Sequence, residues 1–440
     1  MTAATLSGLA AHGIAGRQDL PIPFWAAVAG SAVALLATFA ILAFAWPTPR
    51  LNGNRAGTEV PGWLARLLDS PAWSWGWRVV GVLVAAYVGL AALFGPDDAL
   101  NPTAGFIYVI FWVGILAVAS ALLGPIWPGL NPIRTLAMLL ARIRGSADQR
   151  PLPTGWGIRP AVLALGSFVW LELVAPDRGT LSVINAYVAL YVVAMLLGVV
   201  VYGLRWLDAA DGFENYSRLV GAMSALGRRE GVRVWRGPLR GLDALRPAPG
   251  MVAFLVLLIG STLYDGLSNS PQWIRIAQSG TLPQPVIGTI GLIAATAAIG
   301  AIYAVAARAS GRIGGAEPRA MPLQFAHSLI PIALGYVIAH YYSLLVIAGQ
   351  QTVQRLSDPL GNGSDLLGVA DRGVDLTWAQ PTTVATVQVL AVVGGHIMAA
   401  LLAHDRAVRV LPARPVAGQL PLLGAMVAFT VTALLLLFAA

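Results

Sequence analysis

Long apolar runs recur along the chain and are separated by short polar stretches rich in glycine and proline. The runs are continuous rather than amphipathic, and most are close to the roughly 20 residues that a helix needs to cross a membrane core of about 30 Å. They predict an all-α fold, a polytopic transmembrane helix bundle of about ten spans in a single domain (residues 1–440). The predicted spans lie near residues 24–46, 79–94, 105–123, 158–174, 181–202, 251–267, 285–307, 321–349, 381–403 and 420–440.

The eighth run, residues 321–349, is unusual because it carries two histidines, His327 and His340. Its length corresponds to roughly 43 Å of helix, which is more than the membrane core requires. Pro331 has no N–H to donate to the carbonyl four residues earlier, so we expect the helix to bend there. Polar side chains inside a span are functional candidates, because lipid does not solvate them.

Composition supports a membrane location and limits the chemistry. The 440 residues are 57% hydrophobic and 11% charged, with no cysteine. Disulfides, thiolate zinc sites and cysteine-ligated iron–sulfur clusters are therefore excluded. The net charge of +8 comes from arginine alone. In a membrane protein this excess is first a topology signal, so the expected partners are the lipid bilayer and a small-molecule or ion substrate rather than nucleic acid.

The arginines alternate between loops in a way that predicts the orientation. Of the 28, 23 lie in the loops after predicted spans one, three, five, seven and nine, counting Arg159 at the border of span four. Arginine accumulates in cytoplasmic loops, so both termini are predicted outside. Ten spans in this orientation also permit a 5+5 inverted repeat, as in many secondary transporters. The remaining five arginines are Arg17, Arg178, Arg275, Arg355 and Arg372.

Two cytoplasmic segments, residues 131–144 and 213–226, repeat apolar residues at helical spacing. The spacing predicts amphipathic helices that lie on the inner leaflet. A docking surface for a partner protein is the alternative.

The outer loop, residues 350–380, contains the turn-rich tract DPLGNGSD and several aspartates. Its composition resembles a Ca²⁺-binding loop, but it lacks the ligand spacing of an EF-hand. A bound cation is the less favoured interpretation of this loop.

Three ionisable groups are predicted at one depth near the outer side of the membrane. Counted from the cytoplasmic ends of their spans, Glu172 and Asp265 lie 14 residues in and His340 lies 18 residues in. With Tyr264 and Tyr336 nearby in sequence, they could relay protons or bind a substrate, and Glu172, Asp265 and His340 could hold a divalent metal. The alternative is that the two carboxylates mark helix ends that reach headgroups and water.

A second polar level is predicted near the inner side, where His327 and His396 lie at comparable depth on neighbouring spans. Two such imidazoles could ligate haem b. Gln388 and His396 are eight residues apart and share a broad polar face, which hydrogen bonding between helices also explains.

Motifs for several chemistries are absent from the sequence. It has no Walker A loop, no HExxH, no GxSxG and no GxGxxG with an acidic partner. The longest cytoplasmic loop is too short for a nucleotide-binding domain, so ATP-driven transport would need a separate subunit.

Five strings, GPDDALNP, GPIWPGLNPIRTL, WLELVAPDR, STLYDGLSNSPQW and FAHSLIPIALGYVIAHYYS, resemble a group of polytopic membrane proteins of high-GC bacteria. These proteins are often labelled fenitrothion hydrolase, and the resemblance runs over most of the chain. It implies a location in the bacterial cytoplasmic (inner) membrane. It also implies hydrolysis of a phosphotriester, for which a water activated by a metal at Glu172, Asp265 and His340 would be the device.

The residues themselves favour a secondary transporter or permease for a small solute or ion, which uses acidic and histidine groups within the bundle. A membrane-embedded, metal-dependent hydrolase is the first alternative. A haem-binding redox subunit is the second.

Overall fold

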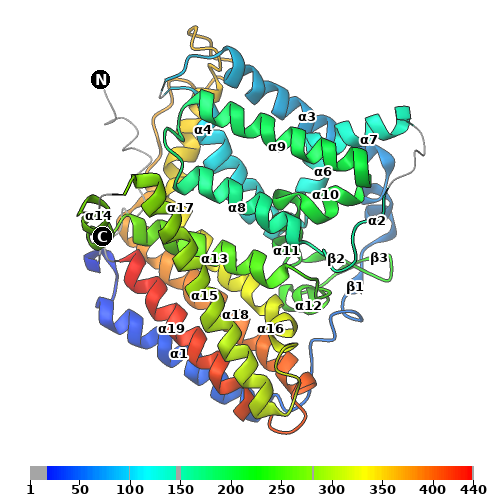
Figure 1. The fold of residues 1–440 in the computed structure, drawn as a ribbon, viewed down its shortest axis with the longest axis vertical. Helices are drawn as coiled ribbons and strands as arrows, with labels where there is room; N and C mark the ends of the chain where they lie inside the picture. Colours follow the sequence, from blue (N-terminus) through cyan, green and yellow to red (C-terminus); the bar gives the residue numbers. More distant parts are fainter. Residues whose placement is uncertain (1–16, 99, 145–149, 280–281, 439–440) are drawn as a thin grey trace. The chain divides into compact units, whose positions relative to one another are not determined.

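The computed structural model describes residues 17–98, 100–144, 150–279 and 282–438 (Figure 1). The chain is 73% helical. Within the described ranges, nine helical segments are long and apolar enough to cross a membrane. The protein is therefore a multi-pass integral membrane protein of the all-α class, as the apolar runs predict.

The chain forms two compact units, each assembled from segments that are far apart in the sequence. Among the described residues, unit 1 comprises residues 58–235 and 343–377, and unit 2 comprises residues 17–57, 236–342 and 378–438. This division does not follow the two halves of the chain, because the first apolar helix belongs with the last ones. The predicted 5+5 repeat gains no support from it and stays a prediction.

Unit 1 contains a long helix, α3, that packs closely on the short helix α6, where a Cβ at Gly81 would lie 1.8 Å from the carbonyl oxygen of Leu130. Its third apolar run includes η3, a π-helix of 14 residues, which is a rare conformation that often occurs at functional sites. The elements are β1 (Thr58–Glu59), α2 (Gly62–Leu68), α3 (Pro71–Phe94), α4 (Pro102–Gly105), η3 (Phe106–Ala119), α5 (Ser120–Leu123), α6 (Trp127–Leu130), α7 (Pro132–Arg144), α8 (Arg159–Leu173), α9 (Leu181–Tyr202), α10 (Arg205–Ala210), α11 (Gly212–Gly221), β2 (Leu226–Arg229) and β3 (Val232–Trp235).

A small antiparallel sheet in unit 1 has the strand order β1-β3-β2. Thr58 pairs with Trp235 across β1 and β3, and Leu226 pairs with Trp235 across β2 and β3. The sheet joins segments that the sequence separates by more than 150 residues. No strand was predicted from the apolar pattern, since these strands are only two to four residues long.

Unit 2 places the first helix, α1, against the last two, α18 and α19 (Figure 1). Its core joins Phe24 and Val28 of α1 to Tyr336 of α17, Val384 of α18 and Leu434 of α19. Helix α17 begins in unit 2 and continues into unit 1 after Tyr342. The elements are η2 (Arg17–Asp19), α1 (Phe24–Ala45), α12 (Pro238–Asp243), α13 (Met251–Ser268), α14 (Pro271–Ser279), α15 (Gln284–Gly314), α16 (Met321–Phe325), η4 (Ala326–Ser328), α17 (Leu329–Leu356), η5 (Thr377–Ala379), α18 (Pro381–Val410), η6 (Ala417–Gln419) and α19 (Leu420–Leu437).

The observed helices match most of the predicted spans. The fifth has the predicted bounds, and the eighth is interrupted by the turn η4, one turn before Pro331. Pro331 then lies in the first turn of α17, where a missing N–H breaks no intrahelical hydrogen bond. The fourth span corresponds to α8, whose 15 residues cover about 22 Å, less than the membrane core. The count of ten spans therefore stays a prediction.

The prediction of an interfacial helix over residues 213–226 is wrong. The helix there, α11, ends at Gly221, and all ten of its residues except Arg218 are buried within unit 1. Its polar side chains face other polar side chains rather than water, a difference that an amphipathic pattern cannot reveal. The other predicted segment does form an amphipathic helix, α7, which exposes Leu136, Leu139 and Leu140.

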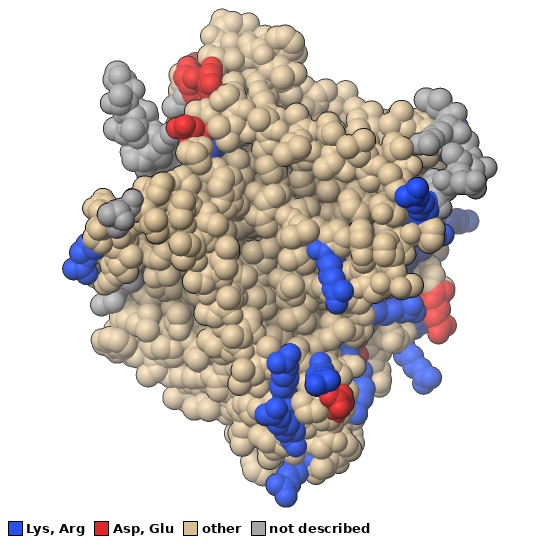
Figure 2. All heavy atoms as spheres, in the orientation of Figure 1, with Lys and Arg blue, Asp and Glu red and all other residues tan. Residues whose placement is uncertain are grey.

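Charged side chains are sparse on the face of the molecule seen in Figure 2, where the basic residues form a few separate groups and most of the surface is uncharged. Large apolar side chains are instead exposed along the helices, such as Phe44 (88%), Leu163 (78%) and Phe94 (73%). Apolar surface of this kind is stable in lipid.

Candidate functional site

Asp265 and His340 form a buried hydrogen-bonded pair inside unit 2. Asp265 lies near the end of α13, and His340 lies in α17. His340 Nε2 is 2.9 Å from Asp265 Oδ2, and the Tyr341 hydroxyl donates to the same oxygen at 2.8 Å. Asp265 and His340 are each 5% exposed. Two of the residues predicted at one depth are thus brought into direct contact, and Tyr341, which follows His340 in the sequence, is the third member of the group.

The two predicted tyrosines lie in the same unit. The ring of Tyr336 is 6.3 Å from that of His340, edge to face, and its buried hydroxyl has no hydrogen-bond partner among the described residues. The ring of Tyr264 packs edge to face on Trp273 at 5.5 Å. Tyr336 is therefore placed beside the pair, whereas Tyr264 packs on an aromatic neighbour.

Glu172, the third predicted metal ligand, lies in α8 of unit 1, whereas Asp265 and His340 belong to unit 2. Within the described part of the chain, no group of three or more histidine, aspartate or glutamate side chains is arranged to hold a metal ion. Protein metal sites of this type take three or more ligands. The Asp265–His340 pair supplies two.

The inner-level residues His327, Gln388 and His396 are all buried, with exposures of 3%, 1% and 2%. His396 Nδ1 bonds the carbonyl of Val392 at 2.8 Å. His327 Nε2, Gln388 Oε1 and His396 Nε2 have no hydrogen-bond partner in the ranges that the structure covers. A buried polar atom without a hydrogen-bond partner destabilises the folded state. Three such atoms are more than a contact between helices needs for structure alone.

Helices α17 and α18 approach each other closely at this level. A Cβ on Gly395 would lie 2.4 Å from the carbonyl oxygen of Pro331, and one on Gly335 would lie 2.4 Å from that of Ala391. Both positions therefore require glycine. A haem held between His327 and His396 would need these two helices to separate.

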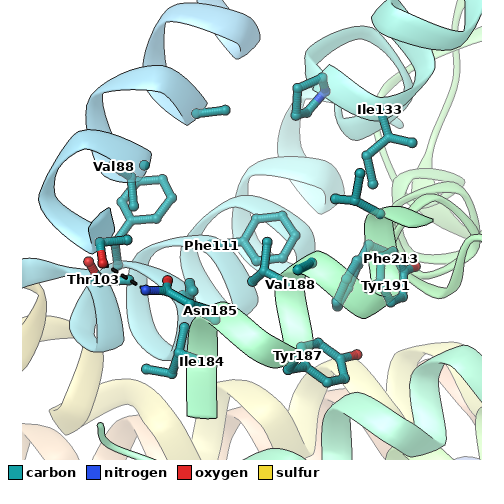
Figure 3. Close-up of a pocket in the computed structure, with 18 of the residues that line it drawn as sticks. Val88, Thr103, Phe111, Ile133, Ile184, Asn185, Tyr187, Val188, Tyr191 and Phe213 are labelled. Atoms are coloured by element: carbon teal, nitrogen blue, oxygen red, sulfur yellow. Dashed lines mark hydrogen bonds between the residues drawn. The ribbon is translucent and has the colours of Figure 1, made fainter. Parts of the chain in front are cut away.

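Unit 1 contains a cavity of about 380 Å³ between α3, η3, α8 and α9 (Figure 3). Aromatic rings form much of its wall, with Phe213 packed edge to face on both Phe111 and Phe168 at 5.0 Å. Its size lies in the range of small-molecule sites. No predicted site residue lines it.

Polar side chains are few in this cavity and are already engaged. Asn185 donates to the carbonyl of Ala92 at 2.7 Å, while Asn131 and Asp211 belong to a hydrogen-bonded network at one end. Thr103 Oγ1 and Trp127 Nε1 are exceptions, because both atoms are buried and have no partner among the described residues.

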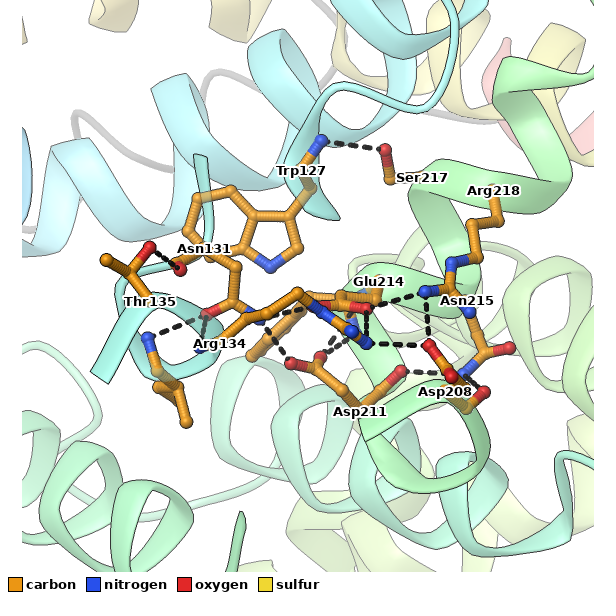
Figure 4. Close-up of polar contacts among 12 residues, drawn as sticks. Trp127, Asn131, Arg134, Thr135, Asp208, Asp211, Glu214, Asn215, Ser217 and Arg218 are labelled. Atoms are coloured by element: carbon orange, nitrogen blue, oxygen red, sulfur yellow. Dashed lines mark hydrogen bonds and ion pairs between the residues drawn. The ribbon is translucent and has the colours of Figure 1, made fainter. Parts of the chain in front are cut away.

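The network at the end of the cavity is built around Asp211, which begins α11 (Figure 4). Its Oδ1 accepts from the Tyr191 hydroxyl and from the backbone N–H groups of Phe213 and Glu214, at 2.9 to 3.1 Å. Its Oδ2 accepts from Asn131 Nδ2 at 2.8 Å. Asp211 thus caps α11 and joins it to α7 and α9.

Glu214 forms the charged part of the network and is fully buried. Its carboxylate accepts from Arg134 at both oxygens, each at 2.6 Å, and from Asn131 at 2.9 Å and Arg218 at 3.0 Å. Asp208, at the exposed edge, accepts from both arginines at 2.7 and 2.6 Å. The bidentate contact with Arg134 is the strong form of a carboxylate–guanidinium pair.

Burial and charge shift the acidities in this network in opposite directions. Burial, together with the charge of Glu214, raises the pKa of Asp211 to about 6. Partial burial alone would raise the pKa of Asp208, but its hydrogen bonds and charge interactions with Arg218 and Arg134 outweigh this and lower it. Of these two aspartates, Asp211 takes up a proton first as the pH falls.

Another polar cluster in unit 2 holds the chain after α1. Asp405 accepts from Trp46 Nε1 at 3.0 Å, from the backbone N–H of Arg50 at 2.6 Å and from Arg409 at 2.7 Å. Asp405 thus ties residues 46–51, which follow α1, to α18.

The aspartates of the outer loop bind their own loop. Asp358 accepts from the backbone N–H groups of Asn362 and Gly363 at 3.0 and 2.9 Å, and Asp365 accepts from Val369, Ala370 and the Ser357 hydroxyl. These contacts are those of turn-capping aspartates, and they lower the pKa of both carboxyls. They account for the aspartates of this tract without a cation.

No protein-family model matches the chain, and no curated protein or solved structure is significantly similar to it.

Proposed function

We propose that this membrane protein is a secondary transporter or permease for a small solute or ion, in which the Asp265–His340 pair binds and releases protons. The proposal rests mainly on the pair itself. Its two residues belong to two apolar helices, each residue is 5% exposed, and His340 Nε2 lies 2.9 Å from Asp265 Oδ2. Ionisable groups are expensive within spans and mark proton or ion pathways where they occur.

The pair can hold one proton at no net charge, either between the two side chains or on His340 with Asp265 ionised. Adding a second proton, or removing the first, gives the pair a net charge in a poorly solvated site. Such a charge favours a conformation in which the site reaches water or a charged solute, and this is how protonation couples to transport. The Tyr341 hydroxyl stabilises the ionised form of Asp265 by donating to it.

The ten spans, the outward termini and the bacterial inner-membrane location belong to this proposal. The arginine distribution between loops supports the span count and the orientation, and the family resemblance supports the location. The resemblance to proteins labelled fenitrothion hydrolase makes a metal-dependent hydrolase the second candidate.

The test uses purified protein in lipid vesicles on a solid-supported membrane, with a pH jump of about one unit as the stimulus. A transient current from proton binding is expected for the wild type and is lost in Asp265→Asn and His340→Ala. Ser261→Ala is the matched control, because Ser261 is similarly buried on α13 and its hydroxyl donates to the Leu258 carbonyl of its own helix.

Wild-type currents in both variants would overturn the role of the pair. Turnover of the phosphotriester paraoxon, without any proton current in the wild type, would favour the hydrolase instead.

A further inference from the structure

The cavity of unit 1 is almost entirely hydrocarbon in character. Its volume of about 380 Å³ is bounded by side chains such as Val88, Ile107, Phe111, Leu171 and Ile184. Asp211 and Asn131 bring strongly polar groups to one end of the wall, and elsewhere on the wall the Asn185 amide donates to the carbonyl of Ala92. A ligand that fills such a space gains free energy mainly from burying apolar surface.

The polar end offers nothing to a charged ligand. Asp211 already accepts four hydrogen bonds and is 1% exposed, and both amide hydrogens of Asn131 are donated to Asp211 and Glu214. An ammonium group would have to displace one of these donors. An anion would face two buried carboxylates. The ligand is therefore uncharged where it lies in the cavity.

The mouth of the cavity opens onto apolar helix surface. Two of its lining residues, Leu93 of α3 and Val188 of α9, are 69% and 42% exposed. Both helices are candidate membrane spans, and only 17% of the most apolar window of each is buried in the protein. The space outside the mouth is thus the space that lipid chains occupy.

We propose that the cavity is a binding site for a hydrocarbon chain of a membrane lipid, which enters between α3 and α9 and ends against the Asp211–Asn131 network. This site does not include the Asp265–His340 pair, so its test is independent of the test of the proposed transport.

Gly89 of α3 provides a clean test, because it lines the cavity and a Cβ at this position would meet no atom within 4 Å. Gly89→Leu therefore fills the cavity without a backbone clash. Gly76→Leu is the matched control, since Gly76 lies on the same helix with equally open surroundings but does not line the cavity.

The probe is a phosphatidylglycerol with a photoreactive diazirine in one acyl chain, added to the purified full-length protein and mapped by mass spectrometry. Wild type and Gly76→Leu are expected to be labelled at Phe111 and neighbouring wall residues. Each buried methylene contributes a factor of about four to binding, so displacing about two of them in Gly89→Leu lowers this labelling about tenfold.

Two further probes, a diazirine-bearing long-chain alcohol and the corresponding alkylammonium, distinguish the outcomes. Equal labelling of Gly89→Leu and Gly76→Leu overturns the site. If only the alcohol labels the cavity, the proposal of a phospholipid chain is refuted, and the site binds free lipophilic molecules instead. If the alkylammonium labels the cavity preferentially, the proposal that the ligand is uncharged is refuted. Val88→Phe, which fills the same wall, replaces Gly89→Leu if that variant does not fold.

Discussion

Replacing Glu214 by glutamine should destabilise unit 1 strongly. Glu214 is fully buried, and its two oxygens accept from Arg134, Arg218 and Asn131. Glutamine keeps the shape but removes the negative charge. It also points an amide NH₂ at a guanidinium, so that one donor faces another.

The magnitude follows from what remains after the substitution. Removing one partner of a buried ion pair costs about 3–5 kcal/mol, because the other charge is left uncompensated. Asp208 still accepts from Arg134 at 2.7 Å, so the lower end, about 3 kcal/mol, is expected. For a unit of about 200 residues this corresponds to a fall in Tm of roughly 6–12 °C.

The 14 tryptophans of the chain allow thermal unfolding to be followed by intrinsic fluorescence in detergent. The control is Asp208→Asn, which removes two ion pairs from a side chain that is 47% exposed and should cost less than about 1 kcal/mol. Added salt should reduce the effect of Asp208→Asn but not that of Glu214→Gln. If the two variants lose the same small amount of stability, Glu214 is not the buried centre of the network.

Two further predictions concern packing and pH. Gly395→Ala should lower the Tm, at a cost of about 1–3 kcal/mol, because its Cβ would overlap the Pro331 carbonyl oxygen. Gly394→Ala on the same helix is the control, since its Cβ meets open space and should raise the Tm slightly, and equal shifts in the two variants would contradict the close approach of the helices. The pKa of Asp211 is raised from 3.8 to about 6 on folding, so the folded state binds this proton more tightly and the contribution of Asp211 to stability rises as pH falls from about 6 to about 4. The difference in Tm between wild type and Asp211→Asn should follow this slope, and a pH-independent difference would show that Asp211 ionises normally.

The apolar runs predict the helices because length and apolar content suffice for a helix in lipid. Residues 181–202 form α9 with the predicted bounds. The π-helical hydrogen bonding of η3 leaves no trace in the sequence, since that run is apolar on every side and shows no preferred period.

Counting residues along the spans predicted a common depth for Glu172, Asp265 and His340. Depth is only one of the coordinates that define a site. Asp265 and His340 meet within unit 2, and Glu172 belongs to unit 1. The grouping of helices into units is set by long-range packing that a single span does not encode.

The network around Asp211 and Glu214 was missed for a different reason. The segment DGFENYSR has the alternation of an amphipathic surface helix, and the same pattern results whether its polar face meets water or the side chains of distant residues. Its main partners, Asn131 and Arg134, lie about 80 residues earlier. The signal that could have revealed it is the acidic group Asp208, Asp211 and Glu214 together with Asn131 and Arg134, in two segments that are both predicted on the cytoplasmic side.

The buried position of α11 has a consequence for how the protein is made. Its carboxylates leave water only when Asn131, Arg134 and Tyr191 are present to receive them, and all three precede α11 in the chain. When the ribosome reaches Glu214, its partners Asn131 and Arg134 have already been synthesised. The helix α11 can therefore pack against these residues as soon as it leaves the ribosome. Because its partners come first in the chain, its carboxylates need not stay exposed while the later helices are inserted into the membrane.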